Sequence, residues 1–167
     1  MRTHRAYLLL LTILLTLWCA GIVAYPLLRH SGVSGSGELG AFFGTVCHQL
    51  DGRSWHLLGE PFGVCIRCSA IYFGALCSVF VLWFFPRRWT HLPSMRFLFV
   101  AGAAMAADAF LNIAGIWTST ELHRLVTGSA VGLLLHWYLV PLLLEAIDSL
   151  RQSPSAHGDP LHVRKTS

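Results

Sequence analysis

Four long apolar runs divide the chain, and a polar segment separates each run from the next. The runs cover about residues 6–28, 61–85, 97–117 and 122–148. A helix needs about 20 consecutive apolar residues to cross the hydrocarbon core of a bilayer, and every run reaches that length. The pattern predicts an all-α integral membrane protein, with four transmembrane helices in a single domain over residues 1–149.

The ends of the runs carry helix signals. The first run is longer than the core of a signal peptide, which has about 7 to 15 residues, so we interpret it as a retained anchor helix. Pro61 suits the first position of the second helix, and Pro86 ends that helix. The tail over residues 150–167 is polar, contains proline and has no period, so we expect it to be disordered.

The polar segment between the first two runs has a helical period of its own. Apolar residues recur there at spacings of three and four: Leu39, Phe42, Phe43, Val46 and Leu50. This spacing is typical of one apolar helix face. It favours a short helix over about residues 38–50 that lies at the membrane interface, with Cys47 and His48 in its last turn.

Composition supports the membrane assignment and excludes one class of partner. Hydrophobic residues make up 54% of the 167 residues and charged residues only 12%, whereas soluble domains carry about 25% charged residues. The formal net charge of +4 is modest, and no basic stripe is interleaved with aromatic residues, so we expect no binding to nucleic acid. The expected partner is the lipid bilayer, with other membrane proteins or a second copy of the chain as further partners.

The distribution of Lys and Arg predicts the orientation. With four spans, the N-terminus, the middle loop and the tail share one side, which carries eight of these residues: Arg2, Arg5, Arg87, Arg88, Arg96, Arg151, Arg164 and Lys165. The other side carries four: Arg29, Arg53, Arg67 and Arg124. Because basic loops stay on the cytoplasmic side, we expect a protein of a prokaryotic inner membrane with both termini in the cytoplasm.

Two of the five cysteines form a pair at the start of the second span. Cys65 and Cys68 are three residues apart and therefore share a helix face. A helix N-terminus, together with Arg67 between the two cysteines, favours thiolate over thiol. Thiolate is the form that binds a metal ion and the form that attacks a disulfide. Cys19 and Cys77 lie inside apolar runs, where a thiol behaves as a small hydrophobic group.

Cys47 and His48 extend this pair into a pattern with metal-ligand spacing. A Cys-His pair, sixteen intervening residues and a Cys-x-x-Cys pair resemble the two halves of a tetrahedral zinc site. Neighbouring residues on a helix point about 100° apart, so Cys47 and His48 cannot both bind one ion from a regular turn. His56 is then the spare fourth ligand. The expected cofactor is a transition metal ion, with zinc first.

Two other functions fit the same residues. In one, Cys47 exchanges disulfides with the Cys65 and Cys68 pair, and the electrons pass to a quinone held between helices, as in a membrane thiol oxidoreductase. In the other, the protein is a non-catalytic accessory subunit of a larger membrane complex. The sequence leaves all three functions open.

A second polar group lies inside the spans. Asp108 lies within the third run, where an ionisable residue indicates a functional site. By depth we expect it to pair with Arg124, supported by Asn112 and Thr127, either for function or to fix the helix register. Small residues predict close helix packing on the third span, at Gly102, Ala103, Ala106 and Ala107, and on the fourth, at Gly128 and Gly132.

Several of these residues together form a compound motif. The motif comprises Cys47-His48-Gln49, Arg53-Ser54, Cys65-Ile66-Arg67-Cys68, Ile71-Tyr72 with Gly74, Asp108, and Arg124-Leu125-Val126-Thr127-Gly128. Over about residues 40 to 135 the chain resembles a family of small predicted membrane proteins of prokaryotes, domain of unknown function 2085. Ala70 stands where the family pattern has glycine. The resemblance implies a membrane protein in which these residues matter, and it implies no particular activity.

Overall fold

The computed structural model describes residues 2–84 and 94–152, with side chains for residues 5–84 and 94–150. Four helices in this part of the chain are long and apolar enough to cross a membrane, which confirms the predicted all-α membrane fold. They are α1 (Arg2–His30), α3 (Ile66–Phe84), α4 (Met95–Ile113) and α5 (Glu121–Gln152). Most of the predicted basic middle loop and nearly all of the predicted disordered tail lie outside the described residues.

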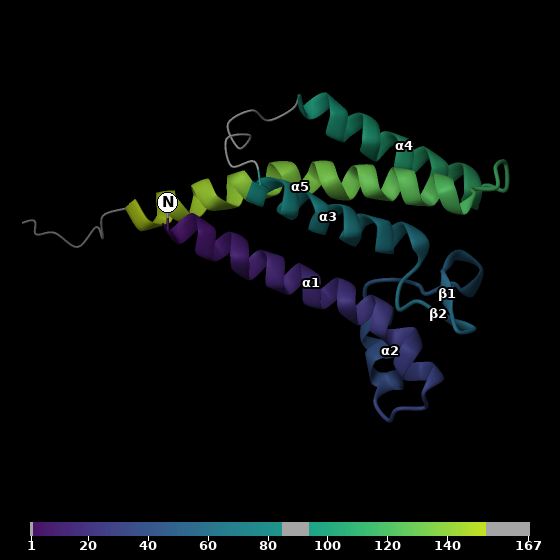
Figure 1. The fold of residues 1–167 in the computed structure, drawn as a ribbon. Coiled ribbons are helices and arrows are strands. Elements are labelled where there is room, and N and C mark those ends of the chain that lie inside the picture. Colours follow the sequence, from purple (N-terminus) through teal and green to yellow (C-terminus); the bar gives the residue numbers. More distant parts are fainter. Residues whose placement is uncertain (1, 85–93, 153–167) are drawn as a thin grey trace, which may run out of the picture.

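The four long helices form a bundle in which α5 lies between α3 and α4, and α1 lies along the other side of α3 (Figure 1). The start of α1 and the end of α5 lie at one end of the bundle, and α2 (Ser36–Gly44) lies at the opposite end with a short hairpin. The described chain therefore begins and ends at the same end of the bundle. The segments that connect α1 to α3 lie at the opposite end.

Glycines let α3 and α5 approach to backbone contact. A Cβ atom added at Gly132 would lie 2.1 Å from the carbonyl oxygen of Ile71, and one at Gly128 would lie 2.7 Å from that of Arg67. On α3, a Cβ at Gly74 would lie 2.6 Å from the carbonyl oxygen of Ser129. The predicted close packing at Gly128 and Gly132 is confirmed.

The corresponding prediction for α4 is wrong at its glycine. Apart from the neighbouring residues and the backbone of α4 itself, no atom of the described chain lies within 4 Å of a Cβ added at Gly102, and no described residue of α4 is buried. The small residues of α4 face away from the bundle because α4 contacts α5 through a different side, which includes Asp108.

Two clusters of buried side chains hold the bundle together. The first lies toward the N-terminal end of α1 and comprises Leu8, Val79, Leu82, Val140 and Leu144. Beside it, the indole N–H of Trp83 on α3 donates to the hydroxyl of Thr12 on α1, at 2.9 Å. The second lies at the other end of α1 and comprises Ile22, Tyr25, Phe43, Cys47 and Val64. This second cluster includes one of the cysteines of interest.

The short helix α2 ends earlier than predicted. It stops at Gly44 rather than near Leu50, so Cys47 follows the helix instead of lying in its last turn. The amide of Cys47 still donates to the carbonyl oxygen of Phe43, at 3.0 Å. Gln49 then has a φ of 47°, and a right-handed helix cannot continue through that left-handed conformation.

The second span also begins later than predicted, because a hairpin takes up its expected first turn. Strand β1 (His56–Leu57) pairs antiparallel with β2 (Glu60–Pro61). Leu58 and Gly59, which connect the strands, both have positive φ, as a two-residue hairpin loop requires. Pro61 therefore lies opposite His56 in the hairpin, and α3 begins at Ile66.

The third span ends at Ile113 rather than at Trp117. Gly115 has a φ of 71°, which is the left-handed conformation that commonly ends a helix. The side-chain amide of Asn112 donates to the carbonyl oxygen of Trp117, at 3.1 Å. Asn112 therefore closes the turn after α4.

Candidate functional site

Three cysteines from two separate segments meet at the end of the bundle that holds α2. The sulfur atoms of Cys47, Cys65 and Cys68 all lie within 4.8 Å of one another, and we call these residues the cysteine cluster. Cys47 follows α2, Cys65 directly precedes α3, and Cys68 lies in the first turn of α3. All three are thiols without a disulfide.

Local hydrogen bonds fix Cys65 at the start of α3. Its carbonyl oxygen accepts the amide of Ser69, at 2.9 Å, as in the first turn of a helix. Its own amide points the other way and donates to the sulfur of Cys47, at 3.2 Å. This hydrogen bond links the segment that carries Cys47 to the segment that carries Cys65 and Cys68, without a bound ligand.

Cys47 has the most enclosed sulfur-bearing side chain of the cluster. The residue is only 7% exposed, while Cys65 and Cys68 are half-buried. The neighbouring thiols of Cys65 and then Cys68 lower the pKa of the Cys47 thiol, and the backbone amide of Cys65, which donates to its sulfur, acts in the same direction. These donors outweigh burial, which acts in the opposite direction.

Aromatic side chains pack around the cluster from three elements. Phe43 of α2 is 2% exposed, and its ring meets that of Trp18 on α1 edge to face, with centroids 5.6 Å apart. Trp18 also meets Tyr72 of α3, with centroids 5.4 Å apart. Such contacts restrict the rings, so α1, α2 and α3 are held together next to the sulfur atoms.

The spacing of the sulfur atoms fits a shared metal ion. Thiolates on a tetrahedral zinc ion lie about 2.3 Å from the metal, which places them about 3.8 Å from one another. The upper limit of 4.8 Å in the cysteine cluster requires only small side-chain movements to reach that value. The same proximity also fits disulfide exchange within the cluster, which is the alternative use of these thiols.

The two predicted histidine ligands are not part of the cluster. His48 follows Cys47 directly in the chain and is exposed. His56 lies in β1, and its Nε2 is 3.0 Å from a carboxylate oxygen of Asp51. Of the five residues that the sequence pattern assigns to a metal site, the structure brings three together.

Asp108 forms an ion pair, but its partner differs from the prediction. Its carboxylate pairs with the guanidinium of Arg67 on α3, and the same oxygen accepts the hydroxyl of Ser119, at 2.9 Å. The side chains of Asp108 and Arg67 are 10% and 21% exposed. The expected pairing with Arg124 is wrong, because the contact at Gly128 brings the start of α3 close to α5, within reach of α4.

The two residues expected to support that pair have other roles. Asn112 closes the turn after α4, as described above. The hydroxyl of Thr127 donates to the carbonyl oxygen of His123 within its own helix, at 2.7 Å. Asp108 is thus linked to the segment Cys65–Cys68 through Arg67, and not to the start of α5.

The sequence reasoning missed a role for Gln49, whose side chain bridges two parts of the site. Its amide nitrogen lies 2.9 Å from the carbonyl oxygen of Gly40 and 2.8 Å from that of Gly63. Gln49 belongs to the compound motif, but its residue type does not indicate this role, since glutamine does not favour the left-handed backbone found here.

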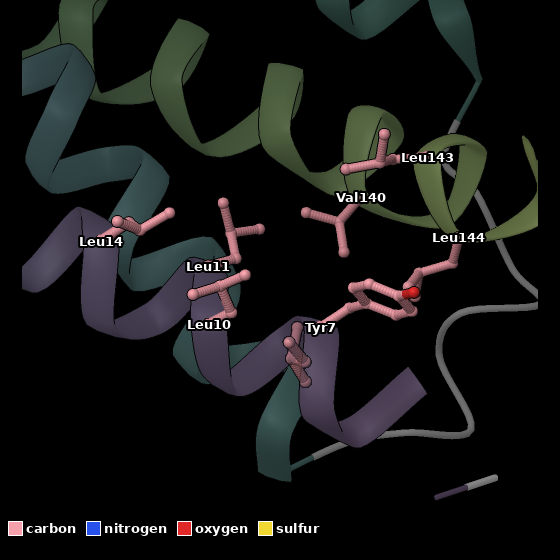
Figure 2. A pocket seen from close by; sticks show the side chains of 8 residues that line it. Tyr7, Leu10, Leu11, Leu14, Val140, Leu143 and Leu144 are labelled. Atoms are coloured by element: carbon pink, nitrogen blue, oxygen red, sulfur yellow. The ribbon is translucent and has the colours of Figure 1, made fainter. Parts of the chain in front are cut away.

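An apolar groove follows α1 away from the cysteine cluster. Near the N-terminal end it is a cavity of about 170 Å³ between α1 and α5, lined by Tyr7 and by aliphatic side chains (Figure 2). A second cavity of about 340 Å³ shares Leu11 and Leu14 with the first and extends to Trp18, Val46 and Tyr72. The groove therefore reaches the residues next to the thiols.

Comparison with known proteins agrees with the motif. A family model described as a predicted membrane protein, DUF2085, matches residues 47–138. The uncharacterized protein MJ1492 of Methanocaldococcus jannaschii is 30% identical over 108 residues, which cover 64% of this chain and 69% of the relative. An uncharacterized protein of Methanothermobacter thermautotrophicus is 28% identical over 91 residues, covering 54% of this chain and 81% of the relative.

No solved structure matches the chain. The matched segment of the family model begins at Cys47 and ends in α5. It therefore contains the whole cysteine cluster and the pair of Arg67 and Asp108. The resemblance inferred from the cysteine motifs is confirmed, and the chain belongs to the DUF2085 family of predicted membrane proteins.

Proposed function

We propose that this membrane protein binds a transition metal ion that prefers thiolate ligands, zinc first, through Cys47, Cys65 and Cys68. The observation that carries the proposal is the convergence of three sulfur atoms from two separate segments within 4.8 Å. A dithiol that only forms a disulfide needs two sulfur atoms. A third sulfur, delivered from another part of the chain, supplies a third ligand to a metal ion.

Three protein ligands leave one position of a tetrahedron for another group. Structural zinc sites use four protein ligands, whereas catalytic sites use three and keep the fourth position for water or substrate. When bound, such an ion would act as a Lewis acid on that fourth ligand. His48 is the neighbouring protein group that could fill the position instead, because it follows Cys47 directly and is exposed.

The location of the site is part of the proposal. The count of eight basic residues on one side against four on the other supports a prokaryotic inner membrane with both termini in the cytoplasm. The cysteine cluster then faces the oxidising side of that membrane, where bound metal would protect its thiolates. Labelling intact cells with a membrane-impermeant maleimide tests this, with a cysteine introduced at Ser36 expected to react and one introduced at Ser167 expected not to react.

Metal content tests the proposal directly. The full chain is purified in detergent without chelator, and metal per chain is measured by mass spectrometry. We expect about one ion per chain, lost in Cys65→Ser and kept in the matched control Cys77→Ser, whose thiol lies outside the cluster. Absence of stoichiometric metal, or an unchanged metal content in Cys65→Ser, would refute the proposal.

A second function is favoured by the apolar groove that reaches the cluster along α1. In this case two cluster thiols lose two electrons and two protons to a quinone, forming one disulfide and one hydroquinone. The cavity of about 340 Å³, with Val46 and Tyr72 in its lining, would hold the quinone ring beside the thiols and its apolar tail along α1.

The redox state of the thiols separates the two functions. Alkylation of intact cells, followed by mapping of disulfides, should detect a disulfide within the cluster that increases or decreases when respiration is inhibited. Thiols that stay reduced under both conditions and are protected by metal would exclude the redox function and support the metal site.

A further inference from the structure

We propose that Gln49 is the positioning residue of the cysteine cluster, because its side chain holds Cys47 within reach of Cys65 and Cys68. The part of this inference that concerns metal affinity rests on the proposed function, whereas the part that concerns sulfur proximity does not. The two hydrogen bonds of the Gln49 side chain go to backbone carbonyl oxygens and not to the sulfur atoms. It acts through the segments that carry them.

The side-chain amide of Gln49 joins the two half-sites. It donates to the carbonyl oxygen of Gly40 in α2, at 2.9 Å, and to that of Gly63, at 2.8 Å. Gly63 lies two residues before Cys65, and Gln49 lies two residues after Cys47. Both N–H groups of one amide therefore span the gap between the segment of Cys47 and the segment of Cys65.

The backbone of Gln49 indicates that this bridge holds the chain in a strained conformation. Its φ of 47° lies in the left-handed region, which residues with a Cβ atom rarely adopt. Such conformations persist where the surrounding structure determines them, and they cluster at functional sites. We infer that the two hydrogen bonds of the side chain hold this conformation here.

Both carbonyl acceptors are held firmly. A Cβ atom at Gly40 would lie 2.7 Å from the hydroxyl oxygen of Tyr25, and one at Gly63 would lie 2.7 Å from a ring carbon of Phe43. Each glycine therefore has an aromatic side chain pressed against it. Tyr25 and Phe43 are both buried, so the two glycines that carry the acceptors pack against the core of the protein.

Gln49 lies only two residues after Cys47 in the chain. A change in the side chain of Gln49 that releases the left-handed turn should therefore also move Cys47. Loss of groups that orient metal ligands costs about 10 to 100-fold in metal affinity, and we expect an effect in that range.

The test replaces the two donors without changing the size of the side chain. Gln49→Glu puts a carboxylate against two carbonyl oxygens, and Gln49→Met removes the donors without adding charge. Thr45→Val is the matched control, because it removes a nearby hydrogen bond from the hydroxyl to the carbonyl oxygen of Phe42 that does not join the half-sites. All variants are made in the full chain, with Cys19 and Cys77 replaced by alanine.

Sulfur proximity is measured first, in membranes stripped of metal. Diamide takes two electrons and two protons from two cluster thiols, and the rate of disulfide formation involving Cys47 reports their proximity. We expect this rate to fall in both Gln49 variants and to stay unchanged in Thr45→Val. Equal rates in all proteins would overturn the inference.

Cobalt binding is measured second, from the absorption of the cobalt–thiolate bond in detergent. We expect about ten-fold weaker binding in Gln49→Glu and Gln49→Met than in the control. If the parent protein binds no cobalt while disulfide formation still slows, the metal proposal fails and the positioning role stands. If the parent binds cobalt and both measurements match in the variants, the positioning role fails and the metal proposal stands.

Discussion

Replacing Gly132 by alanine should destabilise the bundle by forcing α3 and α5 apart. The added Cβ atom would lie 2.1 Å from the carbonyl oxygen of Ile71, about 1.3 Å short of the 3.4 Å at which ordinary contact begins. The contacting atom belongs to the backbone, so no rotation of a side chain can relieve the overlap. One of the two helices has to move.

The magnitude follows from two opposing effects. Overpacking a well-packed interior costs about 1 to 3 kcal/mol, and a clash with backbone lies at the upper end of that range. Alanine favours a helix over glycine by about 1 kcal/mol. We therefore expect Gly132→Ala to lose about 2 kcal/mol of unfolding free energy.

Gly102→Ala on α4 is the matched control. It makes the same chemical change inside a helix, but no described atom of another element lies within 4 Å of the added methyl group, so only the gain in helix propensity of about 1 kcal/mol remains. Unfolding in mixed micelles with increasing SDS, followed by tryptophan fluorescence, measures both variants. If the two variants have equal unfolding free energies, α3 and α5 do not make this backbone contact at Gly132.

Three further predictions use the same preparations. Asp108→Asn leaves the guanidinium of Arg67 without its carboxylate and should cost about 3 kcal/mol, whereas Ser119→Ala should cost about 1 kcal/mol; equal, small losses would show that the ion pair contributes nothing. Replacing Leu82, which is 1% exposed, by alanine should lower the unfolding free energy by about 2 to 5 kcal/mol. A loss below about 1 kcal/mol would contradict its buried position. Removing metal with a chelator should speed alkylation of the cluster thiols but not of Cys77, and unchanged cluster rates would count against a bound ion.

The long helices could be predicted from the sequence because their signals are local and repeated. Each apolar run is long enough to cross a bilayer. There it must form a helix, because every backbone group has to be hydrogen-bonded within the segment. The packing of Gly128 and Gly132 could also be predicted, because glycines one turn apart on a membrane helix are a packing signal.

The details around the site could not be predicted, since they depend on contacts between distant segments. Pro61 is equally suited to the start of a helix and to a short edge strand. It lies in a strand because Leu58 and Gly59 form the left-handed turn of a hairpin. Asp108 had two arginines at similar depth, Arg67 and Arg124. The choice between them follows from how closely α3 approaches α5, which the spacing of residues does not specify.

The cysteines show the same division. Spacing alone indicated that Cys47, Cys65 and Cys68 could meet, because such half-sites recur in metal proteins. It also offered His48 and His56 as ligands, and these side chains are not part of the cluster. An exposed histidine in a loop carries no sequence signal that distinguishes a ligand from a neighbour.

The central claim is that three sulfur atoms of this chain bind one metal ion. X-ray absorption at the zinc edge, on the full-length protein loaded with one equivalent of zinc, counts those atoms directly. We predict three sulfur neighbours at about 2.3 Å and one nitrogen or oxygen neighbour, with one sulfur fewer in Cys47→Ser. A zinc ion surrounded only by nitrogen and oxygen, or the same sulfur count in Cys47→Ser, would contradict the claim.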